Sequence, residues 1–158
     1  MVATTTLASI VQRLARDFPE ITFIPGDVCA WSPTDRSVSY RSEPSLKAIA
    51  ELLHEASHGI LQHATYARGI ELLTMERQAW EYAVHQLAPR YGVTLSMEDQ
   101  VVQDALDTYR DWLHARSVCP ACGAAGIETK SQHYHCLHCH TTWRVNDART
   151  CQLRRYTI

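Results

Sequence analysis

The chain has 158 residues, a formal net charge of −2, 46% hydrophobic residues and 20% charged residues. This balance is typical of a globular protein with a real core and excludes collagen-like, low-complexity and disordered chains. No apolar run approaches the roughly 20 residues that span a bilayer, and residues 1–17 lack the apolar segment of a secretory signal. We therefore expect a cytoplasmic protein without membrane contact, whose six cysteines are reduced and available to bind metal.

The charge is distributed unevenly along the chain. Residues 117–158 carry a net charge of +3, which leaves −5 for residues 1–116. The basic excess is modest. It is compatible with a nucleic-acid contact by the C-terminal part and equally with an ordinary solvated surface.

The first half of the chain alternates between helical and extended patterns. Apolar residues at helical spacing from Leu7 to Phe18 predict a helix that Pro19 ends. Residues 21–24 read as a short strand, and residues 28–31 and 37–40 flank a turn sequence, which predicts a hairpin.

Three further helices are predicted before the composition changes. Apolar stripes predict a helix ending near Ile60 and a second over residues 70–88, ended by Pro89. Ser96 and Asp99 form a capping box for the third, whose stripe runs to Leu113. This order predicts an α+β domain over residues 1–116 with a small antiparallel sheet, then a cysteine-rich module over 117–147 and a basic tail over 148–158.

The sequence His54-Glu55-Ala56-Ser57-His58 lies within the helix that ends near Ile60. Residues four apart share one helix face, so both imidazoles can reach one metal ion. Glu55 lies beside them, where a carboxylate can take a proton from a metal-bound water. The pattern therefore predicts a hydrolytic zinc site, the alternative being a helix with two surface histidines.

A third protein ligand must come from another part of the chain. His63 follows the first histidine by nine residues, whereas the longer zinc-protease pattern requires ten. Glu76 falls within the apolar stripe of its helix and Glu71 falls outside it. A buried carboxylate is costly unless it is paired or binds metal, so Glu76 is predicted as the third ligand. The alternative is a salt bridge from Glu76 to Arg41 or Arg68.

Residues 76–89 read ERQAWEYAVHQLAP. Glu, Ala three residues later, an aromatic–Ala pair three further and a Leu-x-Pro ending resemble the second motif of the ImmA/IrrE family of zinc metallopeptidases. The predicted hairpin and the Leu-rich run before His54 extend the resemblance over about residues 20–90. It implies a compact zincin-like domain in which His54, His58 and Glu76 bind a catalytic zinc and Glu55 is the general base. It also implies a cytoplasmic protein substrate, which in that family is often a DNA-binding, helix-turn-helix repressor.

The chain departs from the family pattern without losing a ligand. Trp80 stands where a small polar residue is usual, Ala56 and Ser57 replace a bulky–Gly pair, and the interval from His58 to Glu76 is shorter.

Two accessory roles also follow from this interpretation. His85 or Tyr66 could stabilise the oxyanion that develops during hydrolysis. The edge of the strand at residues 37–40 could hold an extended substrate by adding a strand to the sheet. Both assignments are hypotheses.

Two Cys-x-x-Cys pairs lie thirteen residues apart in the C-terminal module. They are Cys119–Cys122 and Cys136–Cys139, and Gly123 permits the turn after the first pair. Four thiolates complete a tetrahedral zinc sphere with no position left for water, which predicts a structural zinc ribbon. A segment of about thirty residues needs such a metal because it cannot build a sufficient core. The alternative is disulfides or free thiols.

The remaining cysteines fit neither site. Cys29 is predicted to be a small buried side chain and Cys151 a thiol of the tail. Lys130 and Arg144, with the aromatic rings of Tyr134 and Trp143, could contact nucleic acid by charge and stacking. The same two rings could instead form the core of the ribbon.

The sequence thus favours a zinc endopeptidase with two zinc ions per chain, one catalytic and one structural, acting on a regulatory protein. One alternative is a SprT-like protease for DNA-bound proteins, which requires a third histidine ligand. The other is a non-catalytic, zinc-stabilised adaptor or antirepressor. The intact Glu55 favours catalysis, because a purely structural site has no use for that carboxylate.

Overall fold

A computed structural model describes residues 5–158 and divides them into two compact units. The first contains residues 5–64 and 75–104, and the second contains residues 65–74 and 105–158. The region considered for a secretory signal begins at residue 1, and residues 1–4 lie outside the described part. No helix within residues 5–158 combines the length and the apolar character that crossing a membrane requires.

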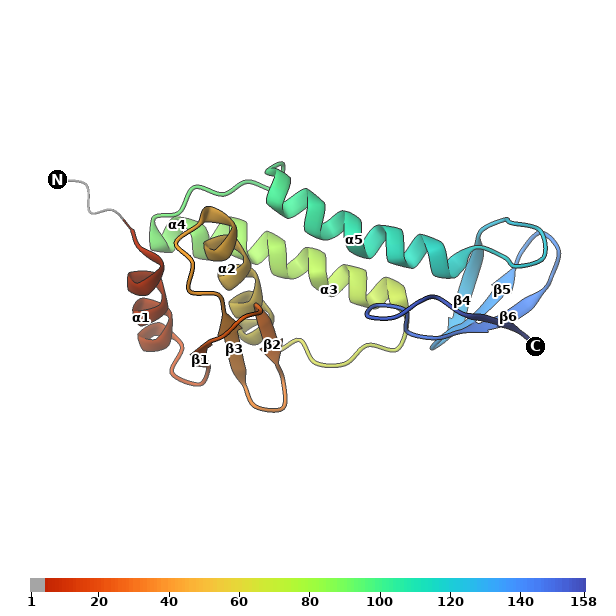
Figure 1. The fold of residues 1–158 in the computed structure, drawn as a ribbon, viewed down its shortest axis with the longest axis horizontal. Helices are drawn as coiled ribbons and strands as arrows, with labels where there is room; N and C mark the ends of the chain where they lie inside the picture. The colour runs from red at the N-terminus through yellow and green to blue at the C-terminus, as the bar shows by residue number, and fades with distance from the viewer. Residues whose placement is uncertain (1–4) are drawn as a thin grey trace. The chain divides into compact units, whose positions relative to one another are not determined.

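The elements follow one another as an α+β chain, as the sequence predicts (Figure 1). In order they are α1 (Leu7–Asp17), β1 (Thr22–Pro25), β2 (Ala30–Ser32), β3 (Ser37–Tyr40), α2 (Leu46–Ile60), α3 (Gly69–Tyr82), the π-helical turn η1 (Ala83–Leu87), α4 (Ala88–Tyr91), α5 (Gln100–Ser117), β4 (Gly126–Lys130), β5 (His133–Cys136), β6 (Thr142–Val145) and β7 (Arg155–Thr157).

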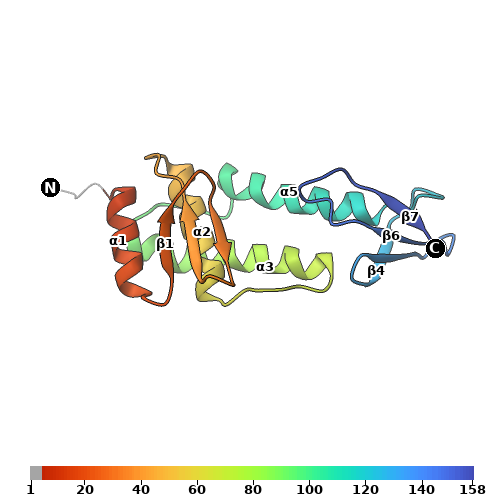
Figure 2. The same cartoon turned by 60° about the horizontal axis from the view of Figure 1, so that its bottom comes forward.

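The sheet of the first unit is mixed rather than antiparallel. Its strand order is β1-β3-β2, with β2 antiparallel and β1 parallel to β3. The predicted hairpin is therefore confirmed, but the sheet is not purely antiparallel, because β1 adds to the far side of β3. Strand β3 is paired on both sides and cannot accept a substrate strand, so that hypothesis is wrong. Helix α2 packs against β3 and β2 (Figure 2).

Gly59 lets helix α2 approach this sheet closely. A Cβ atom at this position would lie 2.8 Å from Ile21 Cδ1 and 2.9 Å from Trp31 Cζ3. Both distances are shorter than van der Waals contact, so a larger residue would push the sheet away from the helix. Gly59 directly follows His58, and the close approach therefore helps to position the candidate site.

Gly59→Ala is expected to lower the free energy of unfolding by about 1–3 kcal/mol, the usual cost of forcing a methyl group into a packed interface. Chemical denaturation of the two proteins measures the difference. Gly26→Ala is the matched control, because a Cβ there meets Ser39 Cβ at an ordinary 3.8 Å. Equal stability of wild type and the Gly59 variant would contradict the packing described.

Pro89 does not end the helix that begins at Gly69, contrary to the sequence prediction. The backbone passes through the π-helical turn η1 into α4, where Pro89 occupies one of the first two positions. The π-helical hydrogen bond from the Ala88 N–H to the Ala83 carbonyl alters the helical hydrogen-bond pattern just before Pro89, where a residue without an N–H can then be accommodated. The helix ends instead at Gly92, whose φ of 72° is the left-handed conformation that favours glycine.

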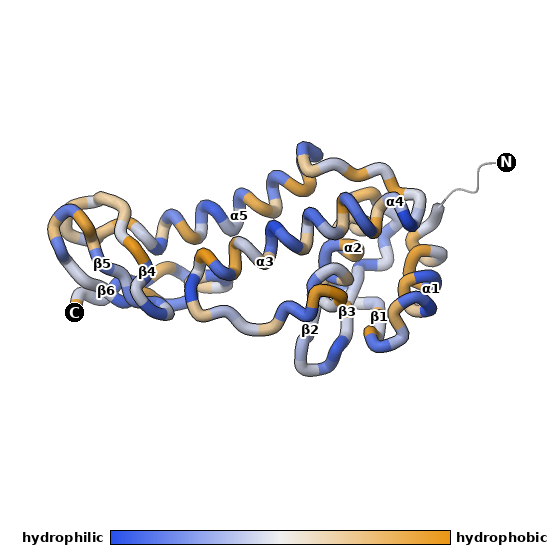
Figure 3. Tube along the Cα trace, turned by 180° about the vertical axis from the view of Figure 1, so that it is seen from behind, coloured by the Kyte–Doolittle hydropathy of each residue, from blue (hydrophilic) through white to orange (hydrophobic). Residues whose placement is uncertain are grey.

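Helix α5 begins with half of the predicted capping box. The Ser96 N–H donates to the Asp99 carboxylate at 2.9 Å, whereas the Ser96 hydroxyl contacts Glu98 instead of completing the box. Val102 and Leu106 on its stripe are fully buried. Figure 3 shows the resulting alternation of hydrophobic and hydrophilic stretches along α5.

The second unit contains a four-stranded antiparallel sheet of order β4-β5-β6-β7. Its core consists of one cluster: Cys119, Tyr134, Cys136, Trp143 and Val145. The rings of Tyr134 and Trp143 stack on each other at 5.4 Å and are buried, so they form the ribbon core and are not available to stack on bases.

The domain boundaries predicted from the sequence, after residues 116 and 147, differ from the observed division into two units in two respects. The region predicted as a tail supplies β7, which pairs with β6 and so belongs to the sheet. The division also runs through helices α3 and α5, so the second unit includes residues 65–74 and 105–117 with the ribbon. The buried carboxylate of Glu128 explains why parts of helices α3 and α5 belong to the same unit as the ribbon.

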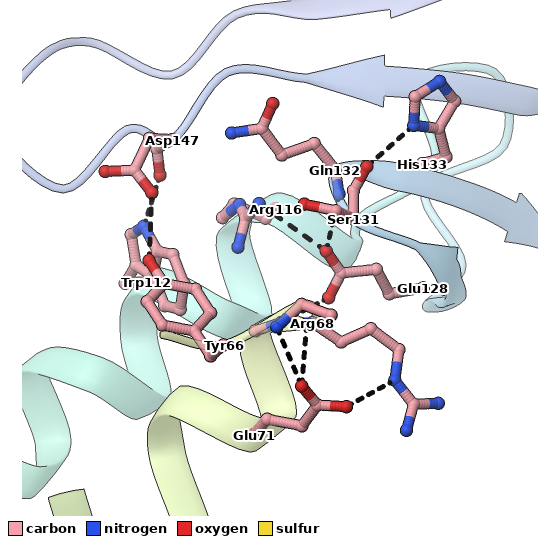
Figure 4. A network of polar contacts seen from close by, with 12 residues as sticks. Tyr66, Arg68, Glu71, Trp112, Arg116, Glu128, Ser131, Gln132, His133 and Asp147 are labelled. Carbon is pink, nitrogen blue, oxygen red and sulfur yellow. Dashed lines mark hydrogen bonds and ion pairs between the residues drawn. The ribbon is translucent and has the colours of Figure 1, made fainter. Parts of the chain in front are cut away.

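Glu128 joins strand β4 to the start of helix α3 (Figure 4). Its carboxylate accepts hydrogen bonds from the backbone N–H groups of Gly69 at 2.6 Å and Gln132 at 2.8 Å. The buried guanidinium of Arg116, at the end of α5, lies 3.7 Å from the same carboxylate. These contacts tie the ribbon to the ends of helices α3 and α5 through polar groups.

Candidate metal centres

Two buried histidines of α2 and one buried glutamate of α3 meet in the first unit. The Nε2 atoms of His54 and His58 lie 3.1 Å apart. The carboxylate oxygens of Glu76 lie 2.9 Å from His54 Nε2 and 3.2 Å from His58 Nε2. All three side chains are almost inaccessible to solvent. The structure therefore places in one cluster the three residues that helix spacing and the apolar stripe predicted as ligands.

The ligand atoms of the three groups are all turned toward one another. Glu76 Oε2 lies 2.9 Å from His54 Nε2, yet this buried oxygen has no hydrogen-bond partner within residues 5–158. A tetrahedral zinc ion with bonds of about 2.0–2.1 Å separates its N and O ligands by about 3.3 Å. The observed separations are close to that value. The donor set therefore fits a single divalent ion, and His54, His58 and Glu76 form one of two groups that could hold a metal within residues 5–158.

The salt-bridge alternative for Glu76 is excluded by the partners of the two arginines. Arg41 pairs with Glu51 at 2.6 Å, and Arg68 pairs with Glu71 at 3.2 Å. Burial alone would raise the pKa of Glu76, but the adjoining imidazoles outweigh it and hold the pKa well below its usual range. The carboxylate is therefore ionised, as a metal ligand must be.

Glu55 stands beside the ligand cluster and outside it. Its Oε1 is 3.9 Å from His54 Nε2, and its Oε2 accepts a hydrogen bond from the Trp31 backbone N–H at 2.8 Å. The side chain is only 18% exposed. Burial raises its pKa, with the neighbouring histidines opposing that shift. A desolvated carboxylate with a raised pKa is suited to accept and return a proton.

His63 supports a metal ligand, a role that sequence spacing did not reveal. Its Nδ1 lies 2.9 Å from His58 Nδ1. If His58 Nε2 binds a metal, its Nδ1 carries the proton and donates it to His63 Nδ1. The His63 backbone carbonyl in turn accepts a hydrogen bond from the Trp31 indole at 2.9 Å. Trp31 thus orients both Glu55 and His63, and no pattern in the sequence signals this.

His63→Ala is expected to weaken metal binding at the His54–His58–Glu76 site by about 10–100-fold, the usual cost of losing a ligand's hydrogen-bond partner. Competition with a chelator of known affinity measures the change. His85→Ala is the control, because His85 lines the same surface hollow as His63 but makes no ring contact with His58. Equal weakening by both substitutions would contradict a specific role for His63.

Trp80 takes the place of a polar partner for His54. The indole stacks on the imidazole with ring centroids 4.3 Å apart and an interplanar angle of 21°, and no group within residues 5–158 forms a hydrogen bond with His54 Nδ1. The ring of His54 is therefore oriented by stacking, whereas His58 is oriented by a hydrogen bond. This contact gives Trp80 a physical role at the site.

An open hollow of about 500 Å³ is lined in part by His63, the residue that contacts the ligand His58. It contains the candidate oxyanion residue His85 as well as His63. Its lining residues are Leu61, His63, Gln78, Glu81, Tyr82, His85 and Gln86. The other oxyanion candidate, Tyr66, belongs to the second unit, where its hydroxyl donates to Asp147. The hollow is large enough to admit a side chain of a peptide substrate.

The four predicted cysteines form the second group that could hold a metal. Cys119 Sγ lies 3.6 Å from Cys139 Sγ, and Cys122 Sγ lies 3.6 Å from Cys136 Sγ. Four thiolates around a tetrahedral zinc with bonds of about 2.3 Å are about 3.8 Å apart. The cluster therefore has the dimensions of a zinc site with four cysteine ligands. The Thr141 hydroxyl and backbone lower the pKa of the Cys139 thiol to about 6.

The two Cys-x-x-Cys knuckles have the same backbone geometry. The N–H of Gly123 donates to the Cys119 carbonyl, and the N–H of His140 donates to the Cys136 carbonyl, both at 2.9 Å. Gly123 has a φ of 76° and His140 a φ of 63°. Sequence reasoning identified the first turn from its glycine but had no such signal for the second.

None of the six cysteines, all of which lie in the described part of the chain, forms a disulfide within residues 5–158. Cys151 is exposed, in agreement with its place near the C-terminus. Cys29 is half-buried rather than fully buried, and burial raises the pKa of its thiol beside Arg41 and Glu51.

Comparison of the chain with models of protein families, with curated proteins and with solved structures found no match in any of the three.

Proposed function

We propose that this protein is a zinc-dependent endopeptidase with a zincin-like catalytic domain, as the resemblance to the ImmA/IrrE family implies. One observation carries the proposal: three buried ligand atoms converge beside a desolvated carboxylate that is not itself part of the cluster. A structural zinc site has four protein ligands. A site with three protein ligands and an adjacent base is typical of hydrolysis.

When bound, zinc supplies a Lewis acid that polarises a peptide carbonyl and lowers the pKa of water to about 7. Residues of the chain transfer the proton and orient the reacting groups. Glu55 accepts the proton of the attacking water and returns it to the leaving amine. The Trp31 N–H holds the Glu55 carboxylate in position at 2.8 Å, and His63 and Trp80 hold the two imidazoles.

The proposal also includes the class of substrate. A regulatory protein in the cytoplasm, such as a helix-turn-helix repressor, is the substrate that the family resemblance suggests. Strand β2 is an edge strand, and its Trp31 N–H points to Glu55 rather than to β3. An extended peptide segment that reaches Glu55 would approach beside this edge, where the Trp31 N–H is already bonded to the Glu55 carboxylate.

The SprT-like alternative is disfavoured by the identity of the third ligand. That alternative needs a third histidine, but His63 contacts Nδ1 of His58, on the side of the ring away from the ligand cluster. Glu76 fills the third position instead. The adaptor or antirepressor alternative has no specific observation in its favour.

The four-cysteine cluster would hold a second, structural zinc ion. Its four sulfur atoms leave no position for a reactive water, so its role is to hold the two knuckles together. The buried cluster around Trp143 is small, and a metal contributes folding free energy that such a core lacks.

Incubation of the zinc-loaded protein with a diverse peptide library, followed by mass spectrometry, tests the proposal. We expect cleavage at internal peptide bonds that stops on addition of a zinc chelator and returns with added zinc. The absence of any new peptide terminus from the library and from a co-expressed repressor would favour the non-catalytic alternative.

A further inference from the structure

The sheet of the second unit exposes one face that none of the proposed chemistry uses. Along β6 the side chains alternate, because successive residues of a strand point to opposite faces. Trp143 and Val145 are buried in the ribbon core, and Arg144 between them is exposed. The core therefore lies on one side of the sheet, and Arg144 marks the other.

Strand register continues this outer face across β5, β6 and β7, and a register shift between Glu128 and Lys130 in β4 brings Lys130 opposite His133. Lys130 pairs with His133, His133 pairs with Arg144, and Arg144 pairs with Tyr156. Side chains directly opposite one another in antiparallel strands share a face. Lys130, His133, Arg144 and Tyr156 therefore form one line perpendicular to the strands, here called the cross-sheet row. It spans about 14 Å, since strands lie about 4.8 Å apart.

The cross-sheet row is positively charged and has no acidic neighbour on its face. Lys130 and Arg144 make no ion pair with any residue between 5 and 158. Residues 117–158 contain only two acidic side chains. The carboxylate of Glu128 is buried and accepts backbone hydrogen bonds, and Asp147 accepts the Tyr66 hydroxyl. The two cations are thus uncompensated and available to an anionic partner.

The row also offers an exposed aromatic ring. Tyr156 is 42% exposed, and the Arg144 guanidinium lies over its ring, 4.8 Å from the centroid. This differs from Tyr134 and Trp143, whose rings are buried. An exposed ring beside cations that form no ion pair is a combination that binds single-stranded nucleic acid, because the cations contact phosphates while the ring face that Arg144 leaves open stacks on a base.

We propose that the cross-sheet row binds single-stranded DNA. A duplex keeps its bases stacked inside, so it cannot use the Tyr156 ring. Single-stranded RNA presents the same phosphates and bases and adds a 2′-hydroxyl, so RNA of the same sequence is the competing ligand in the test. The site is independent of the proposed peptidase chemistry.

Fluorescence anisotropy with the zinc-loaded full chain and a labelled 12-nucleotide single-stranded DNA tests this proposal. Arg144→Ala and Tyr156→Ala are each expected to weaken binding by about tenfold, whereas Tyr156→Phe retains it because the ring still stacks. The logarithm of the association constant is expected to fall with the logarithm of salt concentration with a slope of about −1.4, for two phosphate contacts. Arg16→Ala, which removes an exposed arginine from α1, is the matched control and should change affinity less than twofold.

Zinc content and thermal unfolding of each variant verify that the sheet is intact. Arg144→Lys serves as a second variant, since it keeps the charge and should retain most of the binding. Any one of three results would overturn the proposal: no binding to the oligonucleotide, equal loss in Arg16→Ala and Arg144→Ala, or tighter binding to duplex DNA or to RNA of the same sequence. Retention of binding by the peptidase-inactive Glu55→Gln protein is expected, which separates this test from that of the proposed function.

Discussion

Replacement of Glu55 by glutamine is expected to lower kcat for peptide hydrolysis by about 10²–10⁴-fold, the usual contribution of a positioned general base. Glutamine has nearly the same shape and can still accept the Trp31 N–H, so the fold and the three metal ligands are retained. It cannot take up a proton at working pH. Steady-state kinetics on a peptide identified from the library, together with metal analysis, measure the effect.

The pH profile of the wild type provides a further readout of the same residue. Burial raises the pKa of Glu55 above its usual value of about 4.3. The base form is present only above that raised pKa, so kcat is expected to fall as pH falls through it. Glu81→Gln is the control, because Glu81 lines the neighbouring hollow but pairs with Arg77. Full activity of Glu55→Gln with unchanged zinc content would contradict the assigned role.

Replacement of Cys136 by serine is expected to remove one of two zinc ions per chain and to unfold the ribbon. Structural zinc contributes roughly 10–16 kcal/mol of apparent binding free energy in small domains, far more than the small cluster around Trp143 can replace. Metal analysis should fall from two ions to one. Limited proteolysis followed by mass spectrometry should find new cleavage sites within residues 117–158.

Cys151→Ser is the matched control for this substitution. Cys151 is an exposed thiol of the same unit that lies outside the metal-binding group. Its replacement should leave two zinc ions and the proteolysis pattern unchanged. Two zinc ions in Cys136→Ser would show that the ribbon does not depend on the four-cysteine cluster.

Local sequence patterns predicted the metal-binding groups because the spacing of the residues along the chain determines which side chains lie close together. Positions i and i+4 must share a helix face, and a Cys-x-x-Cys pair must form a tight turn. The placement of Glu76 also followed from a physical rule, since a carboxylate within an apolar stripe needs a compensating partner. The α+β order of elements was predicted for the same reason, from periodicity in each segment.

Features that depend on tertiary contacts could not be predicted in this way. Nothing in the sequence fixes the side of β3 on which β1 pairs, so the mixed sheet was missed. The support of His58 by His63 depends on the chain turning back after Ile60. The π-helical turn that carries the backbone past Pro89 has no sequence signature. The pairing of β7 with β6 likewise joins residues that local periodicity treats as a tail.

The central claim is that His54, His58 and Glu76 hold one zinc ion that retains an open position for water. Anomalous diffraction at the zinc absorption edge from crystals of the zinc-loaded protein tests it most directly. The account predicts two zinc peaks per chain, one among the four cysteines and one within about 2.2 Å of two imidazole nitrogens and a Glu76 oxygen. A single peak at the cysteines, or a second zinc closed by a fourth protein side chain, would contradict it.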